Sequence, residues 1–342
     1  MQHFSSLVST LLLVSLAACN DAVTEPPQPV EGSFTVDAST AWVYVSLADS
    51  AVVVPSPSAR ESSAWDIAFN ATSVTLNGGA AGPGGVTGAC LCQNAAASDA
   101  EILAMTTGSE EPDFAAVTSA PSTASFVSDQ LTPAMTGWYT GAGSTAAADA
   151  NRTFLVRLAD GASFAKARVT AIENASGTSA GRVTLEYAVQ AAGNSTFGDV
   201  KTVTFDATAS TSASMTADLN SDAMGGSAGD WDIKLVGWDL LVNGGVSGPG
   251  AAGVATTTEQ FGALTTATGT PPQAYRTDVY AGIFGTNRWY RYNLAGDNRI
   301  SPTFDVYLLK RGTDVYKLQI TNYYSATAQP RHITFRYERI AQ

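Results

Sequence analysis

The stretch Ala64–Phe69 reads Ala-Trp-Asp-Ile-Ala-Phe, and a second stretch, Asp230–Leu235, reads Asp-Trp-Asp-Ile-Lys-Leu. Each is followed by a glycine loop: Asn77–Gly84 reads Asn-Gly-Gly-Ala-Ala-Gly-Pro-Gly, and Asn243–Gly250 reads Asn-Gly-Gly-Val-Ser-Gly-Pro-Gly. Both pairs are separated by the same offset of 166 residues. A constant offset between ordered motifs indicates an internal duplication. We therefore expect two copies of one folding unit.

A later pair of motifs shows where the copies differ in length. Gly137–Tyr139 reads Gly-Trp-Tyr and matches Arg288–Tyr290, which reads Arg-Trp-Tyr, at an offset of 151 residues. The first copy thus carries 15 additional residues between its glycine loop and its Trp-Tyr pair. That interval contains Cys90 and Cys92, so we expect both cysteines in an insertion on the first copy.

Both copies show the sequence pattern of β-strands. Gly181–Tyr187 alternates apolar and polar residues, and Arg331–Glu338 repeats this alternation, which is typical of strands with one buried face. Phe154–Leu158 and Asp305–Leu309 are short apolar runs with polar flanks, and Asn-Gly and Asp-Gly turn signals separate such runs. The better helix candidates are two short stretches, Asp99–Met105 and Thr257–Leu264. We predict an all-β fold with few short helices, in two tandem domains at 33–195 and 196–342.

The repeated motifs have a structural interpretation. In Trp-Asp-Ile, the apolar side chains would be buried on one face of a strand while the aspartate accepts hydrogen bonds from a neighbouring turn. The glycine loop needs positive φ angles and cannot pack as a regular element. It is either a connector or a backbone surface that a ligand can approach closely.

The N-terminus has the pattern of an export signal. Leu7–Ala18 is apolar but too short to span a bilayer, and it ends in Leu16–Cys19, which resembles the bacterial lipobox. In such signals the cysteine becomes the lipidated first residue. We expect a signal peptide at 1–19, lipidation of Cys19 and a proline-containing tether at 20–32. No Lys or Arg precedes the apolar run, so an ordinary secretory signal is the alternative.

Cys90 and Cys92 would remain after processing. Exported proteins meet oxidising conditions, which favours a disulfide between them. A metal site would need further ligands that the neighbouring Ala, Gly and Ser residues do not supply. A redox role would need a flanking base or lysine to lower a thiol pKa.

Composition excludes several functional classes. The 342 residues include 18 Lys+Arg against 30 Asp+Glu, a net charge of −12, so the chain lacks the basic character of nucleic-acid binders. Two histidines and three cysteines leave little material for zinc sites or histidine-based triads, and no phosphate loop or dinucleotide fingerprint occurs. Asp66, Asp232 and Asp239 lie near aromatic residues and could in principle form the carboxylate pair of a glycosidase. Because Asp66 and Asp232 occupy equivalent positions, a repeated structural role is favoured, and we expect no enzyme.

Charge is unevenly distributed along the chain. Residues 273–342 hold ten of the 18 basic residues and five of the 30 acidic ones, together with many tyrosines. Arginines beside aromatic rings suit a planar anionic ligand, because guanidinium groups bind carboxylates bidentately. Haem propionates, acidic sugars and acidic proteins all fit this description. Alternatively, the aromatic residues pack in the core and the arginines form ion pairs with the acidic first copy.

The motifs resemble those of the HmuY family of bacterial lipoproteins. The stretches that carry the resemblance are Trp65–Phe69, Asn77–Gly79, Trp289–Asn293, Ile300–Pro302, Tyr316–Ile320, Asn322–Tyr324 and Thr334–Tyr337. The resemblance implies an all-β fold, a lipid anchor in the outer membrane at the cell surface, and capture of haem outside the cell. It also implies transfer of the ligand to an outer-membrane transporter, without catalysis.

The haem ligands of the family do not carry over. In haem-capturing members one axial histidine follows the Trp-Tyr-x-Tyr-Asn segment, and Asn298 stands near that position here. Asparagine does not ligate haem iron, so bis-histidine binding is excluded; Met105 and Met135 are candidate axial ligands. The candidate ligand-binding residues are Arg288, Trp289, Tyr290, Tyr292, Asn298, Arg299, Tyr323 and Tyr324. The alternative function is a non-haem module for a glycan, a surface polymer or a protein partner.

Overall fold

The computed structural model describes residues 31–208, 214–225 and 230–341, which form mostly β-strands with three short α-helices. The predicted all-β class is confirmed. The predicted signal peptide and its Cys19 lie outside the described residues. Glu31 and Gly32, which we expected in the tether, already belong to strand β1 (Glu31–Asp37). Within the described ranges, no helix is both long and apolar enough to cross a membrane.

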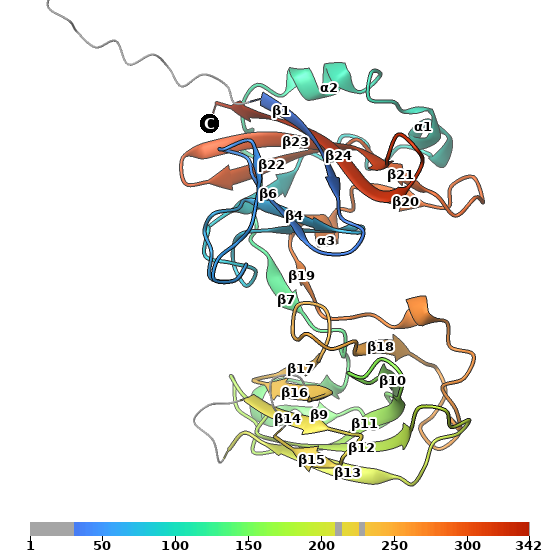
Figure 1. Ribbon diagram of the computed structural model, residues 1–342. Coiled ribbons are helices and arrows are strands. Elements are labelled where there is room, and N and C mark those ends of the chain that lie inside the picture. Colours follow the sequence, from blue (N-terminus) through green and yellow to red (C-terminus); the bar gives the residue numbers. More distant parts are fainter. Residues whose placement is uncertain (1–30, 209–213, 226–229, 342) are drawn as a thin grey trace, which may run out of the picture.

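The first lobe contains two antiparallel sheets built from both ends of the described chain (Figure 1, blue and red). Its five-stranded sheet has the order β1, β24 (Pro330–Ile340), β23 (Asp314–Tyr324), β22 (Val306–Arg311) and β6 (Thr87–Cys90). Its four-stranded sheet has the order β3 (Ala51–Val53), β2 (Val43–Ser46), β4 (Ile67–Asn70) and β5 (Ser73–Leu76). Strands far apart in the sequence therefore share one lobe.

The second lobe contains two antiparallel sheets from the middle of the chain (Figure 1, green to orange). The five-stranded sheet has the order β13 (Lys201–Asp206), β12 (Arg182–Gln190), β11 (Phe164–Glu173), β10 (Phe154–Arg157) and β18 (Gly253–Thr256). The four-stranded sheet has the order β15 (Ala223–Met224), β14 (Ser214–Asp218), β16 (Ile233–Val236) and β17 (Asp239–Val242). The alternation predicted for β12 is confirmed, because Val183, Leu185 and Tyr187 are buried.

The strand orders of the two lobes correspond one to one. Strands β1, β24, β23, β22 and β6 match β13, β12, β11, β10 and β18, and β3, β2, β4 and β5 match β15, β14, β16 and β17. Each five-stranded sheet joins strands from both predicted repeats, since β6 pairs with β22 and β10 pairs with β18. The boundary expected between residues 195 and 196 lies between β12 and β13, which pair in one sheet. It therefore does not separate the two lobes in space.

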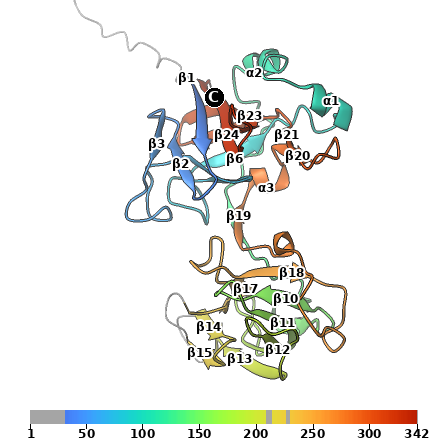
Figure 2. The same ribbon diagram turned by 45° about the vertical axis from the view of Figure 1, so that its right-hand side comes forward.

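Two short strands connect the lobes. Strand β7 (Gln130–Thr132) leads from the first lobe into the second, and β19 (Val279–Ala281) leads back. They pair antiparallel, with Leu131 opposite Tyr280. Strand β19 lies between the lobes in both views (Figure 1 and Figure 2). The chain thus crosses between lobes at one paired position.

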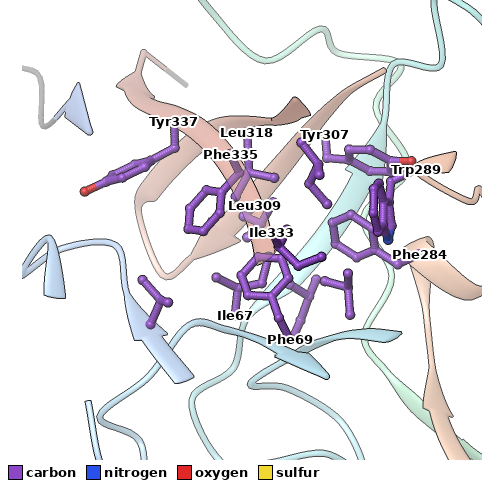
Figure 3. Close-up of a cluster of buried hydrophobic side chains, with 14 of the residues drawn as sticks. Ile67, Phe69, Phe284, Trp289, Tyr307, Leu309, Leu318, Ile333, Phe335 and Tyr337 are labelled. Atoms are coloured by element: carbon purple, nitrogen blue, oxygen red, sulfur yellow. The ribbon is translucent and has the colours of Figure 1, made fainter. Parts of the chain in front are cut away.

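The first core mixes side chains from the two ends of the described chain. Ile67 and Phe69 of β4 pack with Phe335 of β24, and the Phe69 and Phe335 rings are stacked with centroids 5.0 Å apart (Figure 3). The second core is made of residues from Met135 to Val254. Burial of this apolar surface is what holds strands of distant sequence position together.

The duplicated motifs serve the same structural role in each lobe. Asp66 accepts a hydrogen bond from the backbone amide of Leu47 at 2.7 Å, and Asp232 accepts one from Leu219 at 2.8 Å. Likewise, the side-chain amide of Asn77 donates to the Trp65 carbonyl, and that of Asn243 to the Trp231 carbonyl. Both tryptophans are buried. The predicted structural role of the aspartates is confirmed, whereas the tryptophans lie just before the strands β4 and β16, and Trp65 packs in a different cluster from Ile67.

The three helices are α1 (Asp99–Ala104), α2 (Glu111–Ala116) and α3 (Ile283–Thr286). Helix α1 was predicted, and Ser98 caps it reciprocally with Glu101. The other predicted helix, 257–264, is wrong: the segment forms turns. The Lys166 ammonium donates to the carbonyls of Phe261 and Leu264, at 2.9 and 2.8 Å, so a tertiary contact holds these turns.

Cys90 and Cys92 are joined by a disulfide. Cys90 ends β6, a strand that both lobes possess, where it lies opposite Tyr307. The additional residues of the first copy therefore begin after β6, with α1 and α2, and Cys90 itself does not belong to the insertion.

Candidate functional site

The structure divides the eight predicted ligand-binding residues among different surroundings. Trp289 and Tyr323 are only 2% and 7% exposed and belong to the first core. The indole of Trp289 donates to the Thr72 carbonyl at 3.0 Å. Both side chains pack the core of the lobe, and Trp289 also lines a cavity at the junction of the lobes.

Four of the other predicted residues, Tyr290, Tyr292, Asn298 and Arg299, lie in a β-hairpin formed by β20 (Tyr290–Tyr292) and β21 (Ile300–Pro302), and Tyr324 of β23 contacts this hairpin. The Tyr292 hydroxyl donates to the Asn298 side chain at 2.9 Å. The Arg299 guanidinium lies over the Tyr324 ring, 4.7 Å from its centroid. The Tyr324 hydroxyl in turn accepts a hydrogen bond from the Ile300 amide at 2.9 Å. Arg299 and Tyr324 are thus held in fixed positions.

A cavity of about 460 Å³, here called the hairpin cavity, lies beside this hairpin. It is lined by Ile102, Leu103, Met105, Thr106, Thr107, Asp297, Arg299, Ile300, Ser301, Pro302, Phe304, Thr321, Asn322 and Tyr324. Met105 is the residue that ends α1. An ion pair between Arg291 and Asp99, 3.1 Å long, ties the start of α1 to the hairpin. Segments about 200 positions apart in the sequence therefore build one cavity.

Met135 does not join Met105 at this cavity. It lies in the core of the second lobe, is 1% exposed and forms an isolated bridge with Leu240. The structure therefore does not bring the two candidate axial ligands together, because the Met135 side chain packs in the other core. Packing in the apolar core explains why a methionine occurs at position 135.

Three of the predicted residues, Arg288, Trp289 and Tyr290, line a second cavity at the junction of the lobes. This interlobe cleft measures about 660 Å³, and Arg276, Tyr275 and Phe284 also contribute to its walls.

Two short elements, β8 (Tyr139–Thr140) and β9 (Ala147–Ala148), occupy the place in the second lobe that corresponds to the β20–β21 hairpin.

The basic residues of the C-terminal stretch fall into two groups. Five have carboxylate partners: Arg291 with Asp99, Arg311 with Asp66, Lys317 with Glu338, Arg336 with Glu111, and Arg339 with Asp314. Within the described ranges the other five, Arg276, Arg288, Arg299, Lys310 and Arg331, have none, and the first three of these line one of the two cavities. Ion pairing therefore accounts for half of the basic residues of the stretch. Three of the five cations without a carboxylate partner lie at the cavities.

Sequence reasoning missed several residues of these sites. Met105 was predicted, but its neighbours Thr106 and Thr107 and the distant Arg276 were not singled out, because they form no motif. The basic and aromatic character of the C-terminal stretch contained the signal for Arg276, whereas nothing local indicated that α1 would approach the hairpin. That approach depends on contacts between distant segments.

Comparisons with known proteins identify one matching family model. The model of the HmuY protein family matches residues 38–187, a stretch that runs from the loop before β2 into β12 and so through both lobes. No curated protein matches the chain.

Solved structures of similar proteins share little sequence with this chain. A putative lipoprotein from Bacteroides fragilis is 12% identical, with 92% of both chains covered and a TM-score of 0.35. A putative HmuY-like heme binding protein from Bacteroides vulgatus is 10% identical, with 92% of this chain and 94% of that chain covered and a TM-score of 0.35. The apo HmuY analog of Tannerella forsythia is 10% identical, with 92% and 98% covered and a TM-score of 0.30.

Proposed function

We propose that this protein is a ligand-binding lipoprotein without catalytic activity, and that its hairpin cavity takes haem or a related tetrapyrrole for uptake. The observation that carries the proposal is the meeting of Met105, Arg299 and Tyr324 at one cavity from three separate segments. A lipid on Cys19 would hold the protein at the outer membrane, where it would pass its ligand to a transporter. The match to the HmuY family model supports this function.

The chemistry of the cavity suits a planar ligand that carries carboxylates. Arg299 has no carboxylate partner among the described residues, and a guanidinium binds a propionate bidentately. The volume of the hairpin cavity, about 460 Å³, lies in the usual range for small-molecule sites. Met105 offers a thioether, which is a known type of haem-iron ligand. No histidine or cysteine is among the lining residues, so iron would be held from one side by Met105.

Haemin titration of the soluble chain, residues 20–342, tests the proposal. We expect a saturable shift of the Soret band at micromolar haemin. Met105→Ala should weaken binding roughly 10-fold or more and alter the band, because the iron ligand is lost, and Arg299→Ala should weaken binding by a similar factor. Met224→Ala is the matched control, since Met224 is 40% exposed in the other lobe. Absence of any spectral change would remove the haem function.

The interlobe cleft favours a second candidate, a non-haem anionic ligand. Arg276 and Arg288 line it together with Tyr290, and no acidic residue is among its lining residues. A metal-free porphyrin with the same carboxylates distinguishes the two candidates. If it binds as tightly as haemin, and Arg276→Ala and Arg288→Ala weaken it while Met105→Ala does not, the cleft rather than the hairpin cavity is the ligand site.

The matching strand orders support an origin for this architecture. The chain would be a tandem duplication of one HmuY-like unit, with its copies at 33–195 and 196–342. The copies would then have exchanged halves, so that β1–β6 of the first copy complete the lobe of β20–β24 from the second. The pairing of β7 with β19 fits this origin, because equivalent crossover segments meet there. Both cavities of the first lobe would then use residues of both copies.

A further inference from the structure

The second lobe carries a pocket of about 390 Å³ that the haem proposal does not use. Its lining residues are Pro133, Met135, Thr136, Gly137, Trp138, Tyr139, Thr140, Gly141, Trp238 and Asp239. We call it the tryptophan pocket. Its lining combines threonines and glycines with three aromatic rings.

The three aromatic rings of the pocket pack against one another, with Trp138 and Tyr139 edge-on at a centroid distance of 4.6 Å, and we call this group the aromatic platform. The Tyr139 and Trp238 rings have centroids 4.9 Å apart with planes inclined by 37°, and Trp138 lies 6.3 Å from Trp238 with planes 25° apart. The Trp238 indole is fixed by its hydrogen bond to the Ser176 carbonyl at 3.2 Å. Trp138 is buried beneath, whereas Trp238 and Tyr139 are half-buried. The platform is therefore rigid and partly open to solvent.

A carboxylate stands at the edge of this platform. Asp239 is half-buried, and among the described residues its side chain has no hydrogen-bonding or ion-pair partner. Burial raises the pKa of this carboxyl. A partly desolvated carboxylate gains from hydrogen-bond donors that a ligand supplies. The lining contains no lysine or arginine, so an acidic ligand would be repelled.

The equivalent place in the first lobe has different chemistry. Trp238 and Asp239 correspond to Thr72 and Ser73 at the offset of 166 residues, and Gly137 corresponds to Arg288 at the offset of 151 residues. A side chain at Gly137 would meet only Arg152, and its φ of +74° suits glycine, which leaves the platform uncovered. At this place the first lobe thus has the cationic Arg288, whereas the second lobe has the uncovered aromatic platform and the carboxyl group of Asp239.

We propose that the tryptophan pocket binds a neutral sugar residue of a glycan. The apolar C–H face of a pyranose ring would lie on Trp238 and Tyr139. Adjacent hydroxyls would donate to the Asp239 carboxylate. A quaternary ammonium fits less well, because the two rings lie against each other and do not form the separate walls of a cage. This site is independent of the haem proposal and lies in the other lobe.

Binding to a panel of neutral oligosaccharides of glucose, galactose and mannose tests the proposal. The soluble chain, residues 20–342, would be screened on the immobilised panel, and the strongest binders measured by calorimetry. We expect saturable binding that falls at least 10-fold in Trp238→Ala and in Asp239→Asn. Tyr292→Ala, which removes an exposed aromatic residue of the first lobe, should leave binding unchanged. Met105→Ala should also leave it unchanged.

Trp238→Phe separates a binding role from a folding role, because it keeps a ring in the same place. It should retain part of the affinity and melt as the wild type does. The proposal is overturned if no neutral sugar binds, if choline binds and sugars do not, or if sugar binding is unaffected by both Trp238→Ala and Asp239→Asn in folded protein.

Discussion

Asp66, Asp232 and Asp239 are three acidic residues near aromatic rings, and the structure gives them different surroundings. Asp66 accepts a hydrogen bond from the backbone amide of Leu47 and pairs with Arg311 at 2.7 Å. Asp232 accepts from Leu219 and Ala159, at 2.8 and 2.7 Å. The repetition of Asp66 and Asp232 in the sequence was enough to predict a structural role for these two residues. Their hydrogen-bonding and ion-pair partners could not be predicted, because those partners come from other segments of the chain.

Substitution of Asp66 should destabilise the fold, whereas substitution of Asp239 should not. In Asp66→Asn the buried backbone contact weakens and Arg311 loses its partner, which should cost about 1–3 kcal/mol. Asp239→Asn removes no contact and should stay within about 0.5 kcal/mol of the wild type. Urea denaturation measures both. Equal effects of the two substitutions would contradict the structural role of Asp66.

The pH dependence of stability should distinguish Asp278 from Asp206. Burial raises the pKa of Asp278 above 3.8, although the amides of Ala134 and Val242 donate to it. Its contribution to stability is therefore fully present below the unfolded-state pKa and falls as the pH rises through the folded-state pKa. The destabilisation by Asp278→Asn should thus shrink between about pH 4 and about pH 7 in urea titrations.

Asp206 provides the opposite control. The Thr208 hydroxyl and Arg182 donate to it and lower its pKa, so its contribution is present above the unfolded-state pKa and is lost as the pH falls. The destabilisation by Asp206→Asn should therefore grow as the pH rises toward about 4 and stay nearly constant between about pH 4 and about pH 7. A destabilisation by Asp278→Asn that stays constant or grows over that range would contradict the raised pKa of Asp278.

At the scale of elements, local pattern predicted strands well and their partners poorly. The alternation in β12 and β24 fixed which side chains are buried, and Ile333, Phe335 and Tyr337 do face the core. The alternation of apolar and polar residues along a strand does not indicate which distant strand will pair with it. The turns at 257–264 were missed for a related reason, because Lys166 from β11 binds their carbonyls.

Helix α1 matters for the proposed haem site because it ends at Met105. Ser98 accepts a hydrogen bond from the Glu101 amide, and Glu101 accepts one from the Ser98 amide. Loss of such a cap costs about 1 kcal/mol. Ser98→Ala should therefore loosen α1 and weaken haemin binding roughly 2–10-fold, with Met105 still present.

Haemin titration and amide hydrogen exchange across 99–105 measure these two effects together. Thr145→Ala is a suitable control, since the Thr145 hydroxyl makes a comparable local hydrogen bond, to the Ala142 carbonyl, in the second lobe. Faster exchange in α1 with unchanged haemin affinity would show that α1 does not position the ligand site.

At the scale of the whole molecule, each lobe is assembled from both predicted repeats. The constant offsets predicted that two equivalent units exist, and the matching strand orders agree with this. The proposed exchange of halves could not be predicted, because exchanged and unexchanged copies would bury the same residues against the same partners. Only the path of the chain through β7 and β19 distinguishes them.

Cleavage of the exposed loop between Ser195 and Thr196 tests this exchange most directly. A protease site inserted there would cut the connection between β12 and β13 without touching either lobe's core. Because β6 pairs with β22, and β10 with β18, the two fragments should stay together as one particle of unchanged size in size-exclusion chromatography. They should part only in denaturant. Two separately eluting folded fragments after cleavage would contradict the exchanged architecture.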